Sequence, residues 1–339
     1  MVTHKSVIQT MTMVSSVYQP QNAYCIVVDD KSSDEFLKKI QMLADCFPNI
    51  FVLYLSGVDL PLKTNLEMVR IFKQLNGTIN ADVLPFERYR VRLTKGSIKP
   101  PLPLWKSSLS ALISREAADA MVKSDKVLDL LNYLQYTWCS DESLWATIAG
   151  NPEELKIPGG FDAKFFYYSL LRESERCITT QKSTFKSLEQ QQKQKNNKTT
   201  IKTPLSPLTN SFQLSSFYIS RYQIWNQKRY KHPITRTGKQ LARCNGKFVK
   251  ESCVFGVDDM PNLIRRPELV AHKMYMDFEP AAYFCLWKKV RERALDWREQ
   301  NKFNAQVYSQ LPQVRIARGD PEEQIQYFFD DICHLSISG

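Results

Sequence analysis

Carboxylates stand at three places in the chain where a folded protein could use them for chemistry. Asp29 ends the apolar run 24–28, which is typical of a buried strand, and Asp59 follows a second apolar run, 50–55. Ligands of parallel α/β sheets bind beyond the carboxyl ends of the strands, so Asp29 and Asp59 are candidate ligand contacts. Asp141 and Glu142 follow Ser140, a common helix-capping residue, so this acidic pair either favours a helix N-terminus or supplies a proton-transferring carboxylate.

The elements that must position these side chains alternate between strands and helices. Apolar residues at helical spacing predict a helix over 34–47 and another that starts at 64–67, where Thr64 and Glu67 fit the capping-box pattern. Asn76-Gly77 ends that second helix. Strand, helix, strand and helix within the first 77 residues predict an α/β domain with a parallel sheet. Further helices are expected from 114 through 121, from 141 through 148 and over 281–300.

The composition indicates a globular protein whose positive charge is local. The chain has 339 residues, a formal charge of +11 and 43% hydrophobic residues, and it contains no apolar run long enough to span a membrane. Residues 176–250 hold 16 basic residues and one acid, so the rest of the chain is slightly acidic. The Gln-, Lys- and Ser-rich stretch 179–210 is typical of a flexible insertion. Polyanion binding by the basic segment stays open as an alternative, although no nucleic-acid motif occurs.

Eight cysteines and two glycosylation sequons bear on the compartment. None of the cysteines forms a CxxC pair or has zinc-finger spacing, which argues against a structural zinc site. They are compatible with disulfides in an oxidising lumen or with buried thiols. The sequons begin at Asn76 and Asn197 and also favour the secretory route.

Several segments together resemble the core-2/I-branching β-1,6-N-acetylglucosaminyltransferase family, which also includes peptide O-xylosyltransferases. Their order and spacing carry the resemblance, because each alone is weak. The segments are YQPQNAYCIVVD (18–29), CFPNIF (46–51), GVDLPLKTNLEMVR (57–70), SREA (114–117), SDESLWATI (140–148), CVFGVDDMPNLI (253–264) and PELVAHKMYMDFE (267–279).

The resemblance implies a Rossmann-like, GT-A-type glycosyltransferase fold that transfers GlcNAc from UDP-GlcNAc to a glycan acceptor with inversion. It also implies a Golgi type II membrane protein and chemistry without a metal or other cofactor. The sequence contains no Asp-x-Asp motif of the kind that holds a metal in many sugar-nucleotide enzymes. Cationic side chains must then neutralise the diphosphate leaving group.

By resemblance, Glu142 is the general base, and Lys250 and Lys273 contact the diphosphate. Lys250 stands where the family usually has arginine, so it keeps the charge but loses the bidentate fork. Asp29 matches a position near the uridine. The acceptor-binding positions fall on Arg88, Arg90 and Tyr230, whereas an acidic acceptor position of the family falls near Asn80.

The resemblance also implies a disulfide between Cys244 and Cys253. Cys25, Cys46 and Cys285 match family cysteines whose partners are absent, two of them upstream of Met1. Between 51 and 52 the chain lacks a helix and a strand of the family sheet, so we expect a truncated or mis-spliced member. The expected organisation is a glycosyltransferase domain formed by 1–178 and 211–305, interrupted by the insertion 179–210 and followed by a tail, 306–339.

The favoured function is therefore β-1,6-N-acetylglucosaminyl transfer in the Golgi lumen, with a UDP-sugar and a glycan or glycoprotein as partners. Three alternatives remain, a peptide O-xylosyltransferase-like enzyme, a catalytically inactive relative and, least favoured, a polyanion-binding protein.

Overall fold

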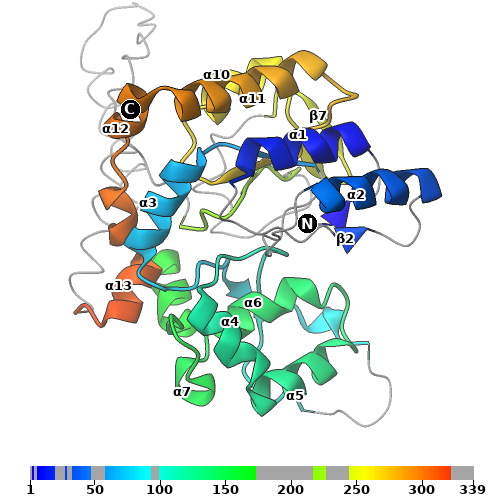
Figure 1. The fold of residues 1–339 in the computed structure, drawn as a ribbon. Coiled ribbons are helices and arrows are strands. Elements are labelled where there is room, and N and C mark those ends of the chain that lie inside the picture. The colour runs from blue at the N-terminus through cyan, green and yellow to red at the C-terminus, as the bar shows by residue number, and fades with distance from the viewer. Residues whose placement is uncertain are drawn as a thin grey trace, which may run out of the picture.

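The computed structural model describes residues 2–3, 6–19, 27–28, 33–46, 58–92, 99–172, 217–226 and 244–321. Within these residues the fold is a mixture of α-helices and small sheets. In Figure 1 the helices α4 to α7 lie in the lower half, and α1, α2, α10 and α11 lie in the upper half with the central sheet. The predicted mixed α/β class is confirmed at this level.

A three-stranded sheet in the order β3-β9-β6 forms the centre of the upper half. β3 (Asp59–Pro61) pairs antiparallel with β9 (Val270–His272), and β6 (Tyr222–Gln223) pairs parallel with β9. α11 (Pro280–Leu295) covers this sheet, and Leu60, Ala271, Tyr283 and Leu286 form part of one core. The expected parallel pairing is therefore mixed with antiparallel pairing. β1 (Val2–Thr3) and β2 (Val27–Val28) form a separate parallel pair.

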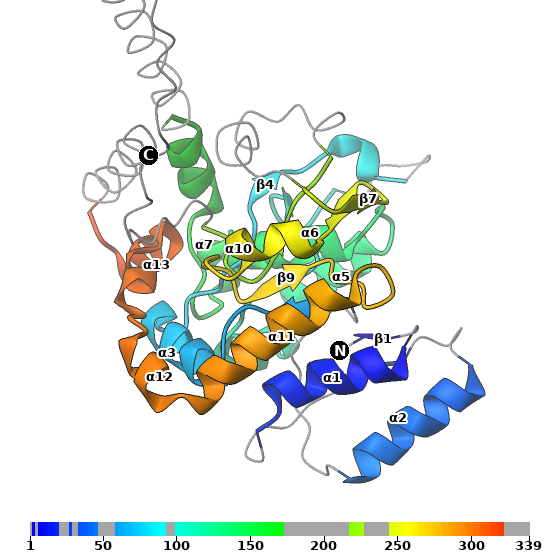
Figure 2. The same cartoon turned by 90° about the horizontal axis from the view of Figure 1, so that it is seen from above.

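α3 (Asn65–Leu75) begins and ends at the predicted residues. Thr64 and Glu67 form both bonds of the capping box, and Asn76 ends the helix in the left-handed conformation. Its buried face carries Met68, Ile71 and Leu75, which belong to the same core as Met13 and Val14 of α1 (Val7–Val17). This core joins the first helices to the C-terminal segment (Figure 2).

The first part of the segment 306–339, which the sequence assigns to a tail, packs onto the folded core. η3 (Gln306–Gln310), Leu311 and α13 (Pro312–Arg318) add Tyr308, Leu311 and Val314 to the core of α1 and α3, and η3 packs against α3. Apolar side chains four or fewer residues apart give this short segment one buried face, which is why it folds onto the domain.

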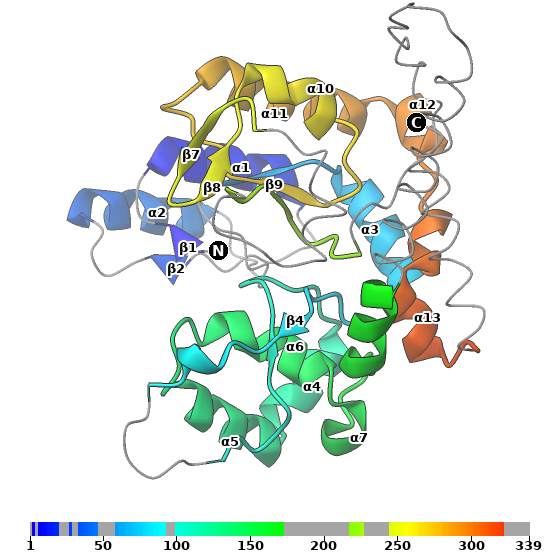
Figure 3. The same ribbon diagram turned by 180° about the vertical axis from the view of Figure 1, so that it is seen from behind.

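The lower half is a helical layer built on a hairpin. β4 (Leu84–Pro85) pairs with β5 (Trp105–Lys106), and α6 (Asp141–Ala149) packs on β5. The other helices of this layer surround a core that includes Ile79, Leu130, Ile148 and Phe161. They are α4 (Arg115–Val122), α5 (Asp125–Leu134), α7 (Pro152–Leu155) and the helical residues 163–172. In Figure 3 the chain of β4 runs between this layer and the sheet above it.

Two further sequence predictions are corrected in detail. The helix expected over 281–300 is broken at Asp296, whose extended backbone ends α11 and whose carboxylate caps α12 (Trp297–Lys302). α2 (Asp34–Cys46) buries Phe36 and Ile40 and exposes Leu37, which was expected on its apolar face. The junction at 51–52 and the insertion 179–210 lie outside the described residues, so the missing sheet segment and the domain boundaries stay predictions.

Candidate active site

Glu142 lies in the first turn of α6, as predicted. Ser140 occupies the N-cap position, as predicted, although its side chain makes no capping hydrogen bond. Asp141 Oδ1 instead accepts a hydrogen bond from the Glu142 amide at 3.0 Å. The opposite face of α6 is anchored by Thr147, whose hydroxyl accepts from the Trp105 amide of β5 at 2.9 Å. The helix is therefore fixed on the sheet side while Glu142 stays partly exposed.

Arg90 binds two carboxylates at once and fixes the orientation of Glu142. Its Nε donates to Glu87 Oε2 at 2.7 Å, and its Nη2 donates to Glu142 Oε2 at 2.9 Å. Lys106 Nζ approaches Glu87 Oε2 at 3.4 Å. The side chain of Arg90 is 8% exposed, whereas that of Glu142 is 27% exposed. One cation thus holds the carboxylate from the protein side and leaves its other side to solvent.

The charges of this site shift the pKa values of Arg90 and Glu87. Burial alone would lower the pKa of the Arg90 guanidinium, but the hydrogen bonds and charges of Glu87 and Glu142 outweigh burial and raise it. Burial would likewise raise the pKa of Glu87. The hydrogen bonds from Arg90 and Tyr89, together with the charge of Lys106, lower it instead. Arg90 is therefore a permanent cation beside Glu142.

Backbone pairing brings these residues together across 52 positions of sequence. Arg90 lies in η1 (Arg88–Arg90), and an isolated bridge joins Val91 to Thr137. The Trp138 amide donates to the Arg90 carbonyl at 2.7 Å. The turn before α6 is thus tied to the segment that carries Arg90. Arg88, in contrast, is exposed and makes no contact with Glu142 among the described residues.

Lys250 and Lys273 lie at a second place, the hairpin of β7 (Lys247–Val249) and β8 (Ser252–Val254). Lys250 is part of its turn, and Lys273 binds its backbone. Lys250 is exposed at the turn with φ of 49°. Lys273 Nζ donates to the Val249 carbonyl at 3.1 Å, next to Lys250 in sequence. Neither lysine makes a hydrogen bond or ion pair with Glu142 in the described part of the chain, so the geometry defines two groups of candidate residues. The predicted disulfide is confirmed, because Cys244 and Cys253 are bonded with their Cα atoms 5.8 Å apart.

A buried charge cluster that the sequence did not reveal includes His272, the residue before Lys273. His272 Nδ1 lies 2.6 Å from Asp59 Oδ1, and Arg221 Nη2 donates to Asp59 Oδ2 at 3.2 Å. Burial lowers the pKa of His272, and the neighbouring Asp59 carboxylate only partly opposes it. Asp59 was expected at a ligand-binding edge but is 1% exposed, so it serves the packing of β3 and β9 instead. The signal available in the sequence was that Asp59 and His272 are polar residues within short apolar strands.

Several predicted residues cannot be placed at the site. Asp29, Tyr230 and the sequon residue Asn197 lie outside the described residues. Asn76 of the other sequon is exposed at the end of α3. Asn80, near the expected acidic acceptor position, is fully buried. Its amide donates to the Phe217 carbonyl at 2.7 Å, and its carbonyl oxygen accepts from the Ile219 amide at 2.9 Å.

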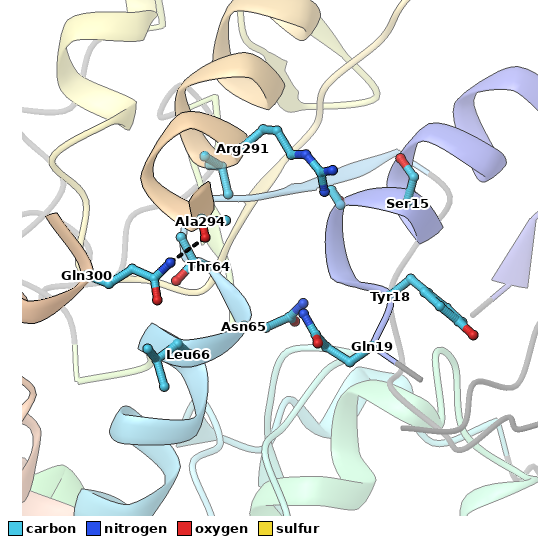
Figure 4. Close-up of a pocket in the computed structure, with 11 residues that line it drawn as sticks. Ser15, Tyr18, Gln19, Thr64, Asn65, Leu66, Arg291, Ala294 and Gln300 are labelled. Carbon is cyan, nitrogen blue, oxygen red and sulfur yellow. Dashed lines mark hydrogen bonds between the residues drawn. The ribbon is translucent and has the colours of Figure 1, made fainter. Parts of the chain in front are cut away.

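A pocket in the described part of the chain contains residues of neither group (Figure 4). It is formed by the end of α1, the start of α3 and α11, with Arg291 pointing toward Ser15 across it. It contains none of the predicted site residues. Within the described ranges no cluster of three His, Cys, Asp or Glu residues has a metal-binding arrangement, and no helix meets the length and apolarity needed to cross a bilayer.

Comparison with known proteins identifies relatives of consistent activity. The chain is 27% identical to a human β-1,3-galactosyl-O-glycosyl-glycoprotein β-1,6-N-acetylglucosaminyltransferase, over 87% of this chain and 69% of the relative. It is 29% identical to a sheep enzyme of the same name, numbered 3, over 87% and 67%. A mouse N-acetyllactosaminide β-1,6-N-acetylglucosaminyl-transferase is 24% identical over 88% and 73%.

A family model matches the chain in two stretches, 1–54 and 50–170, described as the Core-2/I-Branching enzyme. The stretches meet where the sequence predicts a missing segment. Together they cover half of the chain and include Arg90 and Glu142. The chain belongs to the Core-2/I-branching enzyme family of glycosyltransferases.

Proposed function

We propose that this protein transfers GlcNAc from UDP-GlcNAc to a glycan acceptor, with inversion at the sugar and a β-1,6 linkage. The relatives are named for this transfer to β-1,3-galactosyl-O-glycosyl glycoproteins and to N-acetyllactosaminides. The observation that carries the proposal is the placement of Glu142. Its carboxylate is partly exposed, and the buried Arg90 binds one of its two oxygens.

Glu142 is the proposed general base. Oε2 is held by Arg90, while Oε1 has no hydrogen bond in the described part of the chain and is free to accept one from an acceptor hydroxyl. As the hydroxyl oxygen bonds to C1 of the donor sugar, its proton passes to Glu142 and the bond from C1 to the UDP oxygen breaks. Arg90 is a positioning residue in this scheme, because its guanidinium is committed to Glu87 and Glu142.

Lys250 and Lys273 are the proposed cations for the diphosphate that leaves. Two positive charges at one hairpin would stabilise the charge that develops on the leaving group, as a metal does in other sugar-nucleotide enzymes. A Rossmann-like, GT-A-type fold, independence from metal and a Golgi location are parts of the same proposal. They rest on what the resemblance to the core-2/I-branching family implies.

A catalytically inactive family member is the second candidate, and Asn80 favours it. An acidic acceptor contact is expected near this position, but Asn80 is uncharged, and both ends of its amide hold residues 217–219. An acceptor contact from this position is therefore absent, and the acceptor differs from that of the relatives or is lost.

Calorimetric titration of the purified chain with UDP-GlcNAc and UDP-xylose, with and without EDTA, tests the proposal. We expect UDP-GlcNAc to bind more tightly, unchanged by EDTA, and to be consumed when a galactosyl-N-acetylgalactosamine aryl glycoside is added. Preference for UDP-xylose points to xylosyl transfer. Binding without transfer to any acceptor supports the inactive relative, and binding that EDTA abolishes contradicts the metal-free scheme.

A further inference from the structure

An exposed tryptophan stacked with an arginine lies at the start of the turn that leads to Glu142. Trp138 is 56% exposed, and the guanidinium carbon of Arg92 lies 3.8 Å from its ring centroid. A tryptophan ring offers a large apolar surface to a ligand, and tryptophan is enriched at binding interfaces. Because Arg92 covers one face and over half of the side chain remains exposed, part of the ring is open to a ligand.

The backbone holds this pair rigidly. The Arg92 amide donates to the Tyr136 carbonyl at 2.9 Å, and the Trp138 amide donates to the Arg90 carbonyl at 2.7 Å. The bridge between Val91 and Thr137 lies between these two bonds. A ligand that bound here would find the two side chains already arranged, which lowers the entropy lost on binding.

The same bonds connect the pair to the candidate base. Arg90, whose carbonyl accepts from Trp138, is the residue that binds Glu142 through its guanidinium. The Glu142 amide in turn donates to the carbonyl of Cys139, the residue after Trp138, at 3.0 Å. The segments that carry Arg92, Trp138 and Glu142 are therefore tied to one another by backbone bonds and by the ion pair of Arg90.

The charge around Arg92 and Trp138 favours an anionic ligand. Arg90 has two carboxylate partners, whereas Arg92 and Arg88 are exposed and have no carboxylate within ion-pair distance in the described part of the chain. An arginine fork binds a carboxylate through two parallel hydrogen bonds, and the apolar C–H face of a sugar ring fits the electron-rich face of an indole.

We propose that Arg92 and Trp138 form a second acceptor subsite, which binds an acidic sugar beside the sugar that receives GlcNAc. The ring of a glucuronic or sialic acid packs against the part of Trp138 that Arg92 leaves open, and its carboxylate binds Arg92 at the edge of the indole. This inference rests on the proposed function, because it takes the ligand to be part of the glycan acceptor.

A second tryptophan–arginine pair provides a matched control. Trp297 is 67% exposed, and the guanidinium carbon of Arg298 lies 5.5 Å from its ring centroid. This pair belongs to α12, in the half of the molecule opposite α6 (Figure 1), and it adjoins Asp296 and Glu299 rather than unpaired arginines. Exposure is similar at the two pairs, so a difference between them reports on the subsite.

The test is calorimetric titration of the full chain with two acceptors in the presence of UDP. One acceptor is the benzyl α-glycoside of galactosyl-β-1,3-N-acetylgalactosamine, and the other is the same disaccharide carrying a glucuronic acid on its galactose. We expect the wild-type chain to bind the acidic acceptor about tenfold more tightly. Arg92→Gln should abolish this preference, and Trp138→Ala should weaken binding of the acidic acceptor about three- to tenfold. Trp297→Ala and Arg298→Gln should change nothing.

Equal affinity of the wild-type chain for both acceptors, absence of binding, or a preference that survives in Arg92→Gln would overturn the subsite. Transfer of GlcNAc to the neutral acceptor, measured on the same samples, reports separately on the proposed function. Transfer without acidic preference rejects the subsite alone. An Arg92-dependent preference without transfer keeps an acidic-sugar site and rejects the enzymatic proposal.

Discussion

Two charge clusters in this molecule share an architecture and differ in their access to solvent. In each, one arginine donates to a carboxylate that has a second partner. Around Arg90 the carboxylates Glu87 and Glu142 are 32% and 27% exposed. Around Arg221, Asp59 is 1% exposed, and His272 is similarly buried.

This difference separates a site that can meet a substrate from one that holds the fold. A carboxylate open to solvent on one side can accept a proton from an incoming hydroxyl. The buried cluster has no such opening, and the Nε and Nη1 of Arg221 have no hydrogen-bond partner in the described part of the chain. Only the attraction between its members offsets the free energy that their desolvation costs. Removing one member therefore leaves a buried charge without compensation.

The largest expected effect on stability follows from breaking the buried cluster. Asp59→Asn removes the charge shared by Arg221 and His272, and we expect a loss of about 3–5 kcal/mol in the free energy of unfolding. Urea denaturation measures this loss. Glu35→Gln, which breaks the exposed pair with Lys39, is the control and should cost at most about 0.5 kcal/mol. Equal losses in the two variants would remove the distinction between buried and open charge clusters.

A smaller effect is expected at the residue that follows the buried cluster. Lys273→Gln should weaken binding of UDP-GlcNAc about 10- to 100-fold, because a charge-assisted contact to the diphosphate is lost while the hairpin remains. Titration with the nucleotide sugar measures the change. Lys247→Gln in the same hairpin is the control, since Lys247 stacks on Phe278 and has no proposed role. Unchanged affinity in Lys273→Gln would show that the hairpin does not hold the diphosphate.

The smallest effect concerns pH. The pKa of His272 is lowered in the folded chain below its ordinary value of 6.5, so the unfolded state binds more protons in the range just below that value. The stability contributed by neutral His272 is full above pH 6.5 and falls as the pH drops below it, with a slope of at most about 1.4 kcal/mol per pH unit. Unfolding of the wild-type chain between pH 7 and 5.5 should show this slope.

His272→Gln should flatten that slope whatever its effect on overall stability. Glu87 does not interfere, because its lowered pKa makes its contribution decline only at more acidic pH, below the ordinary glutamate value of 4.5. A slope that persists in His272→Gln would place the titrating group elsewhere.

Local sequence signals predicted those parts of the fold that neighbouring residues determine. The capping box of Thr64 and Glu67 located the start of α3, and Asn76 located its end, because these bonds span only a few residues. Glu142 could be placed in a first helical turn for the same reason. The disulfide of Cys244 and Cys253 followed from family resemblance rather than from local rules.

Features that depend on distant contacts escaped prediction. Arg90 meets Glu142 only because the bridge of Val91 and Thr137 aligns two separate segments. The ion pair of Asp59 and Arg221 joins residues 162 positions apart. Asp296 stopped α11 because its side chain caps the next helix, which helical periodicity alone does not reveal.

The most direct test of the central claim is the rate of GlcNAc transfer by Glu142→Gln at saturating UDP-GlcNAc and acceptor. The amide keeps the size of the side chain and a hydrogen-bonding oxygen for Arg90 but cannot act as a base, so we expect the rate to fall about 10²- to 10⁴-fold with donor affinity unchanged. Asp141→Asn, one residue earlier and exposed, should keep the rate within a few-fold. Transfer by Glu142→Gln at the wild-type rate would contradict the assignment of Glu142 as the base.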